Sequence, residues 1–487
     1  MATHLATRSG VYADSVTLMQ VSQAVAGTEG VEAALVAMGT PVNLELLPGM
    51  GFDTDELDAG PNDLVVAIRA SDEDALAAGL DAVDASLAGG GGGTRGFGAP
   101  PAPRTTADAI DEDTTLVLVS TPGEHAVAEA RDALAAGVDV MVFSDHVSVD
   151  DEVALKDVAA EAGLLVMGPD AGTAIVGGVG LGFANVVSPG PVGIVAASGT
   201  GAQQLTCLLD DAGIGISHVL GVGGRDLSAA VGGRATLAAL ALLDEDPATE
   251  LVVVLSKPPA PDVAEAVTTA ADAAATPVRT ALLGPGRDDL TTVAEGIATA
   301  LDRPWPAPTS WPADPPPRRR PGRLVGLFAG GTLATEAVLL AAEVLADPVH
   351  ANVATDVAAP LDGAVTADGH LVVDLGEDDY TAGRPHPMID QSLRLERIAA
   401  EAPDAAVLLL DVVLGHGAHP DPAGELAPAL TSALDANPGL AVVVSLCGTA
   451  GDPQDREAQA AALHAAGASV HLSNAEAVRT AAGLIEA

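Results

Sequence analysis

The sequence has 487 residues, 48% of them hydrophobic, which is enough to bury several cores and too long for a single one. Its 67 acidic and 21 basic residues give a net charge of −46, and this excess argues against nucleic acids and anionic membranes as partners. No run of about 18 apolar residues occurs, and residues 1–10 lack the apolar core of a signal peptide. We therefore expect a cytoplasmic protein without membrane spans.

The acidic excess comes with very little lysine, since Lys156 and Lys257 are the two lysines of the sequence. This composition resembles that of proteins from salt-in halophilic archaea. We therefore interpret the acidic runs as solvated surface, not as cation ligands, and predict no metal site. The two cysteines, Cys207 and Cys447, have neither metal-ligand spacing nor a disulfide pattern, and we interpret each as a small core residue.

The first segment, residues 1–88, alternates helix and strand patterns over a length typical of a small ferredoxin-like α+β domain. Residues 89–113 contain five consecutive glycines followed by prolines, which predicts a flexible linker. A glycine-rich phosphate loop is the alternative, but no strand leads into this stretch. The expected helices are 15–26, 41–49 and 71–87, and the expected strands are 31–38 and 63–68.

Residues 114–189 repeat a strand-then-helix pattern, which predicts a parallel, Rossmann-like sheet. The turn Gly168-Pro169-Asp170 follows the third expected strand and is a candidate cofactor-binding turn. The expected strands are 116–119, 138–143 and 164–167, and the expected helices are 124–136 and 149–162.

The stretch most informative about function is residues 190–226, in a domain predicted over residues 190–302. A β-branched strand over 192–196 runs into a glycine-rich turn and then into a helix over 202–211. Such a turn directs several backbone N–H groups and the positive end of a helix dipole at one point, where a phosphate or carboxylate can bind. The candidate phosphate-binding residues of this turn are Ser198, Gly199 and Thr200.

A second copy of this arrangement lies in the last predicted domain, residues 322–487, after a proline-rich linker over 303–321. Its strand also runs into a Gly-Thr pair and a helix. Two such units predict a pair of related α/β domains, each with a helix start at the carboxyl edge of its sheet. The alternative is that any parallel sheet needs glycines at its strand-to-helix turns. The candidate phosphate-binding residues of the second turn are Gly330, Gly331 and Thr332.

Three side chains of the last domain are candidate catalytic residues. Arg384 could pair bidentately with a carboxylate or phosphate. His386 follows it by two residues, and His416 lies in a glycine-rich turn after an expected buried strand; either could act as an acid or base or donate to a carbonyl. The alternative is that these loops are shaped by prolines and that the histidines bond the backbone. A zinc site that adds His419 and Asp421 is a weaker hypothesis, because no pair has i, i+4 spacing on a helix.

Several motifs resemble the succinyl-CoA synthetase superfamily. Residues 193–200 and 246–249 look like parts of the ligase domain of the α subunit, and Gly168-Pro169-Asp170 resembles the turn that closes that subunit's CoA-binding domain. The domain over 322–487 is similar to the ligase domain of the β subunit. The segments GRPHPMID (383–390) and DVVLGHGAHPDP (411–422) resemble the FdrA family, fused relatives often labelled acyl-CoA synthetases.

The resemblance implies a chemistry that this chain carries only in part. In the superfamily two helix starts face a phosphorylated histidine that moves between nucleotide and CoA sites. That histidine should follow the strand over 277–283, but Gly284-Pro285-Gly286 stands there, and Lys257 follows Ser256 where the family has a glutamate that steadies the histidine. The first half of the CoA-binding fold and an ATP-grasp domain are also missing. We therefore expect no phosphohistidine relay in this chain alone.

Together these features predict a multidomain α/β protein: a truncated Rossmann-like domain of CoA-binding type, two flavodoxin-like ligase domains and a small N-terminal α+β domain. The resemblance implies an acyl-CoA synthetase-like protein that handles an acyl or carbamoyl phosphate, with CoA as the implied cofactor and other subunits of a hetero-oligomer as partners. One alternative is a subunit of an oxamate carbamoyltransferase in allantoin breakdown. A second is a non-catalytic scaffold that binds a small anion.

Overall fold

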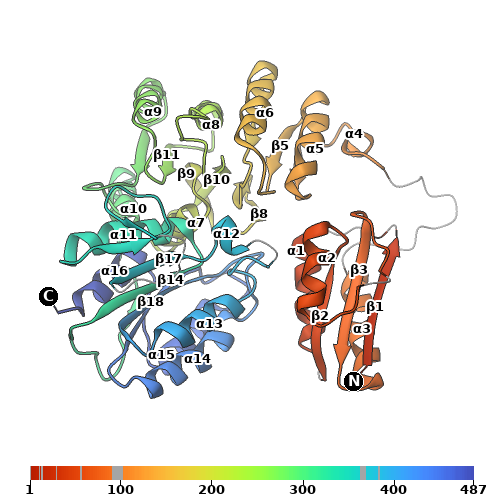
Figure 1. The fold of residues 1–487 in the computed structure, drawn as a ribbon. Coiled ribbons are helices and arrows are strands. Elements are labelled where there is room, and N and C mark those ends of the chain that lie inside the picture. The colour runs from red at the N-terminus through yellow and green to blue at the C-terminus, as the bar shows by residue number, and fades with distance from the viewer. Residues whose placement is uncertain are drawn as a thin grey trace. The chain divides into compact units, whose positions relative to one another are not determined.

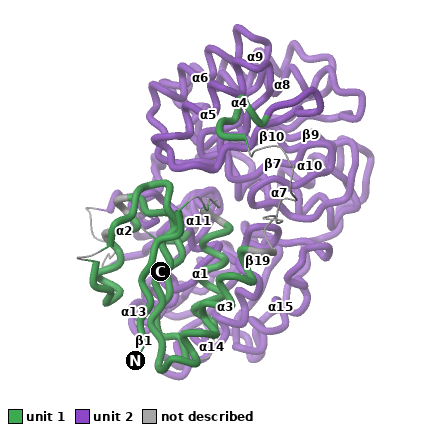
Figure 2. Tube along the Cα trace, turned by 90° about the vertical axis from the view of Figure 1, so that its right-hand side faces the viewer, with its two compact units in different colours: residues 1–109, 382–385 green, residues 110–381, 386–487 purple. Residues whose placement is uncertain are grey.

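The chain divides into two compact units, residues 1–109 with 382–385 and residues 110–381 with 386–487, which we describe separately (Figure 2). Gly383 and most of the predicted linker over 89–113 lie outside the described residues. The computed structural model describes residues 2–9, 11, 15–28, 30–54, 57–89, 103–361, 369–381 and 384–486.

The first unit is a small α+β domain with a three-stranded antiparallel sheet in the order β1-β3-β2. Strand β3 is buried on both faces: Val66 and Ile68 belong to one apolar cluster, and Val65 and Ala67 belong to another that contains Leu47. The antiparallel sheet with a helix after each of its strands confirms the predicted small α+β domain, and the ferredoxin-like topology stays a prediction. The elements are β1 (Ala2–Ser9), α1 (Ser15–Ala26), β2 (Val31–Met38), α2 (Pro41–Gly49), β3 (Asp63–Ala70), α3 (Glu73–Gly89) and the short α4 (Thr106–Ala109).

The second unit begins with the predicted Rossmann-like part, a parallel sheet in the order β4-β5-β6. The next two strands, β7 and β8, form a hairpin that belongs to the following sheet, because Ile175 of β7 pairs with Val219 of β10. The predicted domain boundaries stay a prediction. The elements are β4 (Leu116–Val119), α5 (Gly123–Ala135), β5 (Asp139–Val142), α6 (Val149–Ala162), β6 (Val166–Met167), β7 (Thr173–Val176) and β8 (Val179–Gly182).

The next sheet has six strands in the order β12-β11-β9-β10-β7-β8. Strand β9 lies between β10 and β11 and is parallel to both, so the chain order reverses direction at β9. Ligands of open α/β sheets bind at such reversal points. The elements are β9 (Pro189–Ala197), α7 (Gly199–Asp211), β10 (Ile216–Gly221), α8 (Arg234–Glu245), β11 (Leu251–Ser256), α9 (Pro261–Ala273), β12 (Val278–Leu282) and α10 (Leu290–Ala300).

The last sheet has eight strands in the order β13-β20-β19-β18-β14-β17-β15-β16. Here β14 is the strand at which the chain order reverses, between β17 and β18. The elements are β13 (Ser310–Trp311), β14 (Arg323–Phe328), α11 (Gly331–Val344), β15 (Val349–Ala351), β16 (Ala359–Pro360), β17 (His370–Asp374), α12 (Asp378–Thr381), α13 (Ser392–Glu401), β18 (Ala405–Val413), α14 (Pro422–Ala436), β19 (Ala441–Cys447), α15 (Arg456–Ala465), β20 (Ser469–His471) and α16 (Asn474–Gly483).

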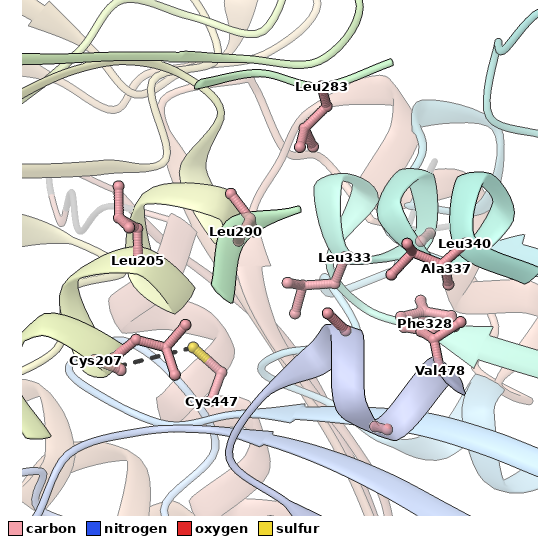
Figure 3. Close-up of a cluster of buried hydrophobic side chains, with 14 of the residues drawn as sticks. Leu205, Cys207, Leu283, Leu290, Phe328, Leu333, Ala337, Leu340, Cys447 and Val478 are labelled. Atoms are coloured by element: carbon pink, nitrogen blue, oxygen red, sulfur yellow. Dashed lines mark hydrogen bonds between the residues drawn. The ribbon is translucent and has the colours of Figure 1, made fainter. Parts of the chain in front are cut away.

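The two large sheets share one layer of helices, α7, α10, α11 and α16 (Figure 1). The largest apolar cluster draws on this layer and on the facing strands of both sheets, as Figure 3 shows for Leu205, Leu333 and Val478. Helices α8 and α9 cover the far face of the six-stranded sheet, and α13, α14 and α15 cover that of the eight-stranded sheet. The predicted multidomain α/β fold is therefore confirmed. Across the described ranges, the model holds no helix with the length and apolarity needed to cross a bilayer.

The apolar cluster between the two large sheets also contains both cysteines. Cys207 of α7 and Cys447 of β19 are buried, and their sulfur atoms lie 3.9 Å apart as free thiols (Figure 3). Burial raises the pKa of the Cys207 thiol, and a thiol is far less nucleophilic than a thiolate. We expect an aromatic disulfide reagent to modify neither cysteine in the folded chain and both after denaturation. Rapid labelling of the folded chain would contradict this packing.

Candidate functional site

The two predicted glycine-rich turns meet where α7 and α11 begin. Ser198 caps α7, since its Oγ accepts a hydrogen bond of 3.0 Å from the Gly201 N–H. The same Oγ lies 2.6 Å from Thr332 Oγ1 in the first turn of α11, and both side chains are buried. The structure thus brings together two segments that lie more than 100 residues apart in the sequence.

Glycine at this junction is required by the close approach of the two helices. A Cβ placed on Gly330 would lie 2.9 Å from three side-chain atoms of Thr200. The first N–H groups of a helix have no acceptor within it. The helix starts therefore direct the N–H groups of Gly199, Thr200, Gly331 and Thr332 toward one region.

A buried carboxylate occupies part of the second turn. Asp411, on β18, accepts hydrogen bonds of 2.8 Å from the N–H groups of Ala329 and Gly330. Its partner Arg394, on α13, is also buried and bonds it at 2.9 Å. Burial raises the pKa of Asp411, while Arg394 and these N–H groups oppose the shift. Because Asp411 already fills the reversal point of the eight-stranded sheet, the Gly330 N–H is not available to a ligand.

The reversal point of the six-stranded sheet carries a lysine. Strand β11 pairs Ser256 with Ala197 of β9, so Lys257 emerges beside the Ser198 cap. Its Nζ lies 3.0 Å from the position that a Cβ on Gly331 would take. Within the described residues Lys257 makes no hydrogen bond or ion pair of 4.0 Å or less. The other lysine, Lys156, is buried in ion pairs with Glu152 and Asp226.

A second carboxylate faces the same glycine. Asp374 ends β17 with 3% exposure, and its Oδ2 lies 2.4 Å from the would-be Cβ of Gly331. Its Oδ1 accepts a 2.9 Å hydrogen bond from the Gly376 N–H. Burial raises the pKa of Asp374 to about 7, and Lys257 opposes this shift. Asp374 is therefore a carboxyl group that can hold a proton near neutral pH.

His386 lies next to Asp374. A Cβ on Gly376 would be 2.6 Å from its Nε2 and 3.2 Å from Asp374 Oδ1. Its Nδ1 accepts a hydrogen bond of 3.2 Å from the Met388 N–H, so the neutral ring carries its proton on Nε2. Burial and, to a lesser degree, Arg394 lower the pKa of His386 to about 4. His386 is therefore a neutral hydrogen-bond donor at physiological pH.

The other predicted site residues lie elsewhere. Arg384 is exposed and is grouped with the first unit, whereas His386 belongs to the second. His416 is exposed, and its backbone N–H bonds Ala184 O in a bridge beside the β7–β8 hairpin. In the turn Gly168-Pro169-Asp170, Asp170 is exposed. Desolvation of its carboxyl group by the surrounding protein raises its pKa, and Lys257 opposes the shift.

The residues of the zinc hypothesis have other partners. His419 Nδ1 accepts the Asp421 N–H, and Asp421 caps α14 through the Gly424 N–H. Within the described residues, the grouping that could hold a metal ion is a different and exposed one, Asp145, His146 and Asp378, whose ligand atoms lie within 4.8 Å of one another. A hydrogen-bonding distance of 2.9 Å already joins His146 to Asp145. Nothing else in this cluster indicates a cation.

Two family models match parts of the chain. A family model described as CoA-ligase matches residues 327–484, and one described as the heavy metal-associated domain of AllF matches residues 1–98. That N-terminal segment contains no cysteine and so offers no thiolate ligand. Among solved structures, a dinucleotide-forming acetyl-coenzyme A synthetase 1 from Ca. Korarchaeum cryptofilum is 15% identical, with coverage of 80% of this chain and 86% of that chain and a TM-score of 0.32.

Two relatives are informative at the sequence level. Subunit alpha 2 of succinate–CoA ligase [ADP-forming] from Archaeoglobus fulgidus is 29% identical over 172 residues, which cover 34% of this chain and 58% of that protein. The uncharacterized protein YahF of Escherichia coli (strain K12) is 37% identical over 453 residues, which cover 87% of this chain and 86% of YahF. Because that identity extends over most of both proteins, the chain belongs to the YahF family, and it carries a CoA-ligase domain.

Proposed function

We propose that the chain is an FdrA-type member of the succinyl-CoA ligase superfamily that binds an acyl or carbamoyl phosphate where α7 and α11 begin. The observation that supports this most directly is the 2.6 Å contact of Ser198 with Thr332, which joins two helix starts at one point. Two positive helix ends and their free N–H groups favour a small phosphate-bearing anion.

In this proposal the backbone does most of the binding. The hydroxyl groups of Ser198 and Thr332 bond each other, and Gly330 bonds Asp411, so these three residues shape the site. The N–H groups of Gly199, Thr200, Gly331 and Thr332 hold the phosphate and stabilise the charge that develops as it leaves. His386 orients the carbonyl group of the substrate through Nε2–H. We also propose that Arg384 and His416 help to orient the substrate, and that CoA binds near Gly168, Pro169 and Asp170.

A carbamoyltransferase subunit in allantoin breakdown is the second candidate. Strand β12, which should precede the phosphohistidine of the superfamily, leads into Gly284-Pro285-Gly286. A reaction that starts from an existing carbamoyl phosphate needs no such histidine. On this proposal the acceptor and further residues come from partner subunits. A non-catalytic anion-binding scaffold would show binding but no turnover with every partner present.

Replacing Thr200 by tryptophan should abolish binding of carbamoyl phosphate without unfolding the chain. Thr200 is half-buried and in contact range of Gly330, so an indole would fill the space between the helix starts. A bulky residue at Thr332 should have the same effect on binding, but it would also break the buried contact with Ser198. The measurement is isothermal titration in about 2–3 M KCl, which screens the surface charge, and Thr269→Trp on the exposed face of α9 is the control.

Carbamoyl phosphate and CoA should be titrated separately. Binding of carbamoyl phosphate alone supports the transferase candidate, and binding of CoA supports an acyl-CoA ligase whose phosphate relay lies in another chain. Unchanged affinity in Thr200→Trp would remove the junction of α7 and α11 as the site.

A further inference from the structure

We propose that two side chains complete this site: the Lys257 ammonium binds the phosphoryl oxygens, and the Asp374 carboxyl gives its proton to the oxygen through which phosphate leaves. This inference rests on the proposed function and deepens it. It assigns the donor substrate to the class of dianionic acyl or carbamoyl phosphates and names the acid that their cleavage requires.

The case for Lys257 is its position and its lack of a partner. It follows β11 at the reversal point of the six-stranded sheet, with Nζ 3.0 Å from the would-be Cβ of Gly331 in the first turn of α11. No acceptor among the described residues takes its three N–H groups. In a chain of net charge −46 with two lysines, an unpaired ammonium beside two helix starts is a natural place for an anion.

The case for Asp374 is a carboxylate oxygen that has no hydrogen-bond donor on a residue that is otherwise buried. Oδ1 is held by the Gly376 N–H, while Oδ2 points at the same glycine as Lys257 and has no hydrogen bond among the described residues. The residue is 3% exposed. A largely buried carboxylate without a protein donor at one oxygen is costly, and a proton on Oδ2 that a phosphoryl oxygen accepts would reduce this cost.

The charges around Asp374 act in both directions on its pKa, and the effect of burial is larger than theirs. Lys257 favours the carboxylate, Glu377 and Asp411 favour the protonated form, and Arg394 lies behind Asp411. Neutral His386 adds no charge. Burial raises the pKa to about 7, and a bound dianion would raise it further, so the carboxyl is an acid when substrate is present.

The step balances without a further reactant. A nucleophile with an N–H or S–H bond attacks the carbonyl carbon, and the bond between that carbon and the bridging oxygen breaks with its electron pair on the oxygen. Without a proton the leaving group would be the phosphate trianion, so Asp374 donates one and hydrogen phosphate leaves. The proton that the nucleophile loses restores the acid form of Asp374, while Lys257 stabilises the charge on the phosphoryl oxygens throughout.

Lys257→Met tests the cation. Titration with acetyl phosphate in KCl should show binding weakened by about 10-fold to 100-fold, the range that a charge-assisted hydrogen bond contributes. Lys257→Arg should keep part of the affinity. The control is Arg303→Met, which removes the same charge from an exposed position of the same unit.

Asp374→Asn tests the acid without needing partner subunits. Asparagine keeps the oxygen that accepts the Gly376 N–H and places its amide where Oδ2 has no hydrogen bond. The probe is sulfate, a dianion that has no proton of its own to exchange at neutral pH. Titrations at pH 7.5 in buffers of different ionisation enthalpy should show uptake of about half a proton per sulfate by the native chain, and none by Asp374→Asn. Asp262→Asn on the exposed start of α9 is the control.

The outcomes separate the two proposals. If the native chain binds neither acetyl phosphate nor sulfate, the proposed function fails and this inference with it. If the native chain binds both and Lys257→Met binds as tightly, the role of Lys257 is wrong while the helix-start site stands. If the native chain binds sulfate without taking up protons, or if Asp374→Asn takes up as many protons per sulfate as the native chain, the role of Asp374 is wrong.

Discussion

Replacing Arg394 by methionine should lower the free energy of unfolding of the second unit by about 3–5 kcal/mol, the usual cost of removing one partner of a buried ion pair. Arg394 and Asp411 are 1% and 0% exposed. Without the guanidinium, Asp411 would be left charged in the core, still bound to the Ala329 and Gly330 N–H groups. The turn that begins α11 should therefore loosen together with the core.

Denaturant unfolding of both proteins in the same KCl concentration measures this effect. Arg303→Met, which removes a charge at an exposed position, should change the free energy by less than about 0.5 kcal/mol. A loss below about 1 kcal/mol in Arg394→Met would mean that Asp411 is neutral in the native chain or that water reaches it.

Raising the pH from 5 to 8 should destabilise the folded chain by about 2.5 kcal/mol through Glu336 alone. Glu336 of α11 is 1% exposed, and burial raises its pKa from 4.5 to about 7 despite hydrogen bonds from the Leu290 N–H and Asn474. The folded state thus prefers the protonated form. This stability is fully present below pH 4.5, the unfolded value, and is lost as the pH rises to about 7. Asp374 shifts in the same direction and adds to the effect.

The variant Glu336→Gln should flatten this dependence. Its amide oxygen can still accept the Leu290 N–H. Its amide nitrogen replaces the oxygen that accepts from Asn474 Nδ2, so the Asn474 amide must turn over and offer Oδ1, which has no partner, as the acceptor. Unfolding curves at pH 5, 6, 7 and 8 in constant KCl are the measurement. Glu343→Gln, at an exposed position of the same helix, is the control and should leave the slope in place. If the free energy of unfolding changed with pH by the same slope in all three proteins, Glu336 would be charged in the folded chain over the whole range from pH 5 to 8.

The sequence predicted the strands and helices that have clear periodicity. The turns of α7 and α11 were expected from a β-branched strand that runs into glycine, and both helices begin at those glycines. Strand β1 was missed because its polar residues resemble a terminal segment. The β7–β8 hairpin was missed although two apolar runs flank Gly177-Gly178, which is a hairpin signal in its own right.

The site was predicted less completely, for a physical reason. The duplicated motif predicted two helix starts, and the resemblance to succinyl-CoA synthetases implied that they face one site. Which side chains line that site depends on strand order, which local sequence does not encode. Lys257 was noted only because it stands where the superfamily has a glutamate. Asp374 and Asp411 were given no role, although each ends or lies within a buried apolar strand, and that position is the signal that distinguishes them from solvated carboxylates.

The helical layer between the two large sheets has a consequence for how the polypeptide is divided. Neither of the two large sheets has a complete interior of its own, because α7, α10, α11 and α16 contribute to one cluster with strands of both sheets. Strand β13, in the connecting segment, is paired with β20 and so already belongs to the second half. If the chain were cut between residues 302 and 310, the two fragments should therefore stay associated like the subunits of an obligate heterodimer. The peptide connection between them ensures that the two halves are made in equal amounts.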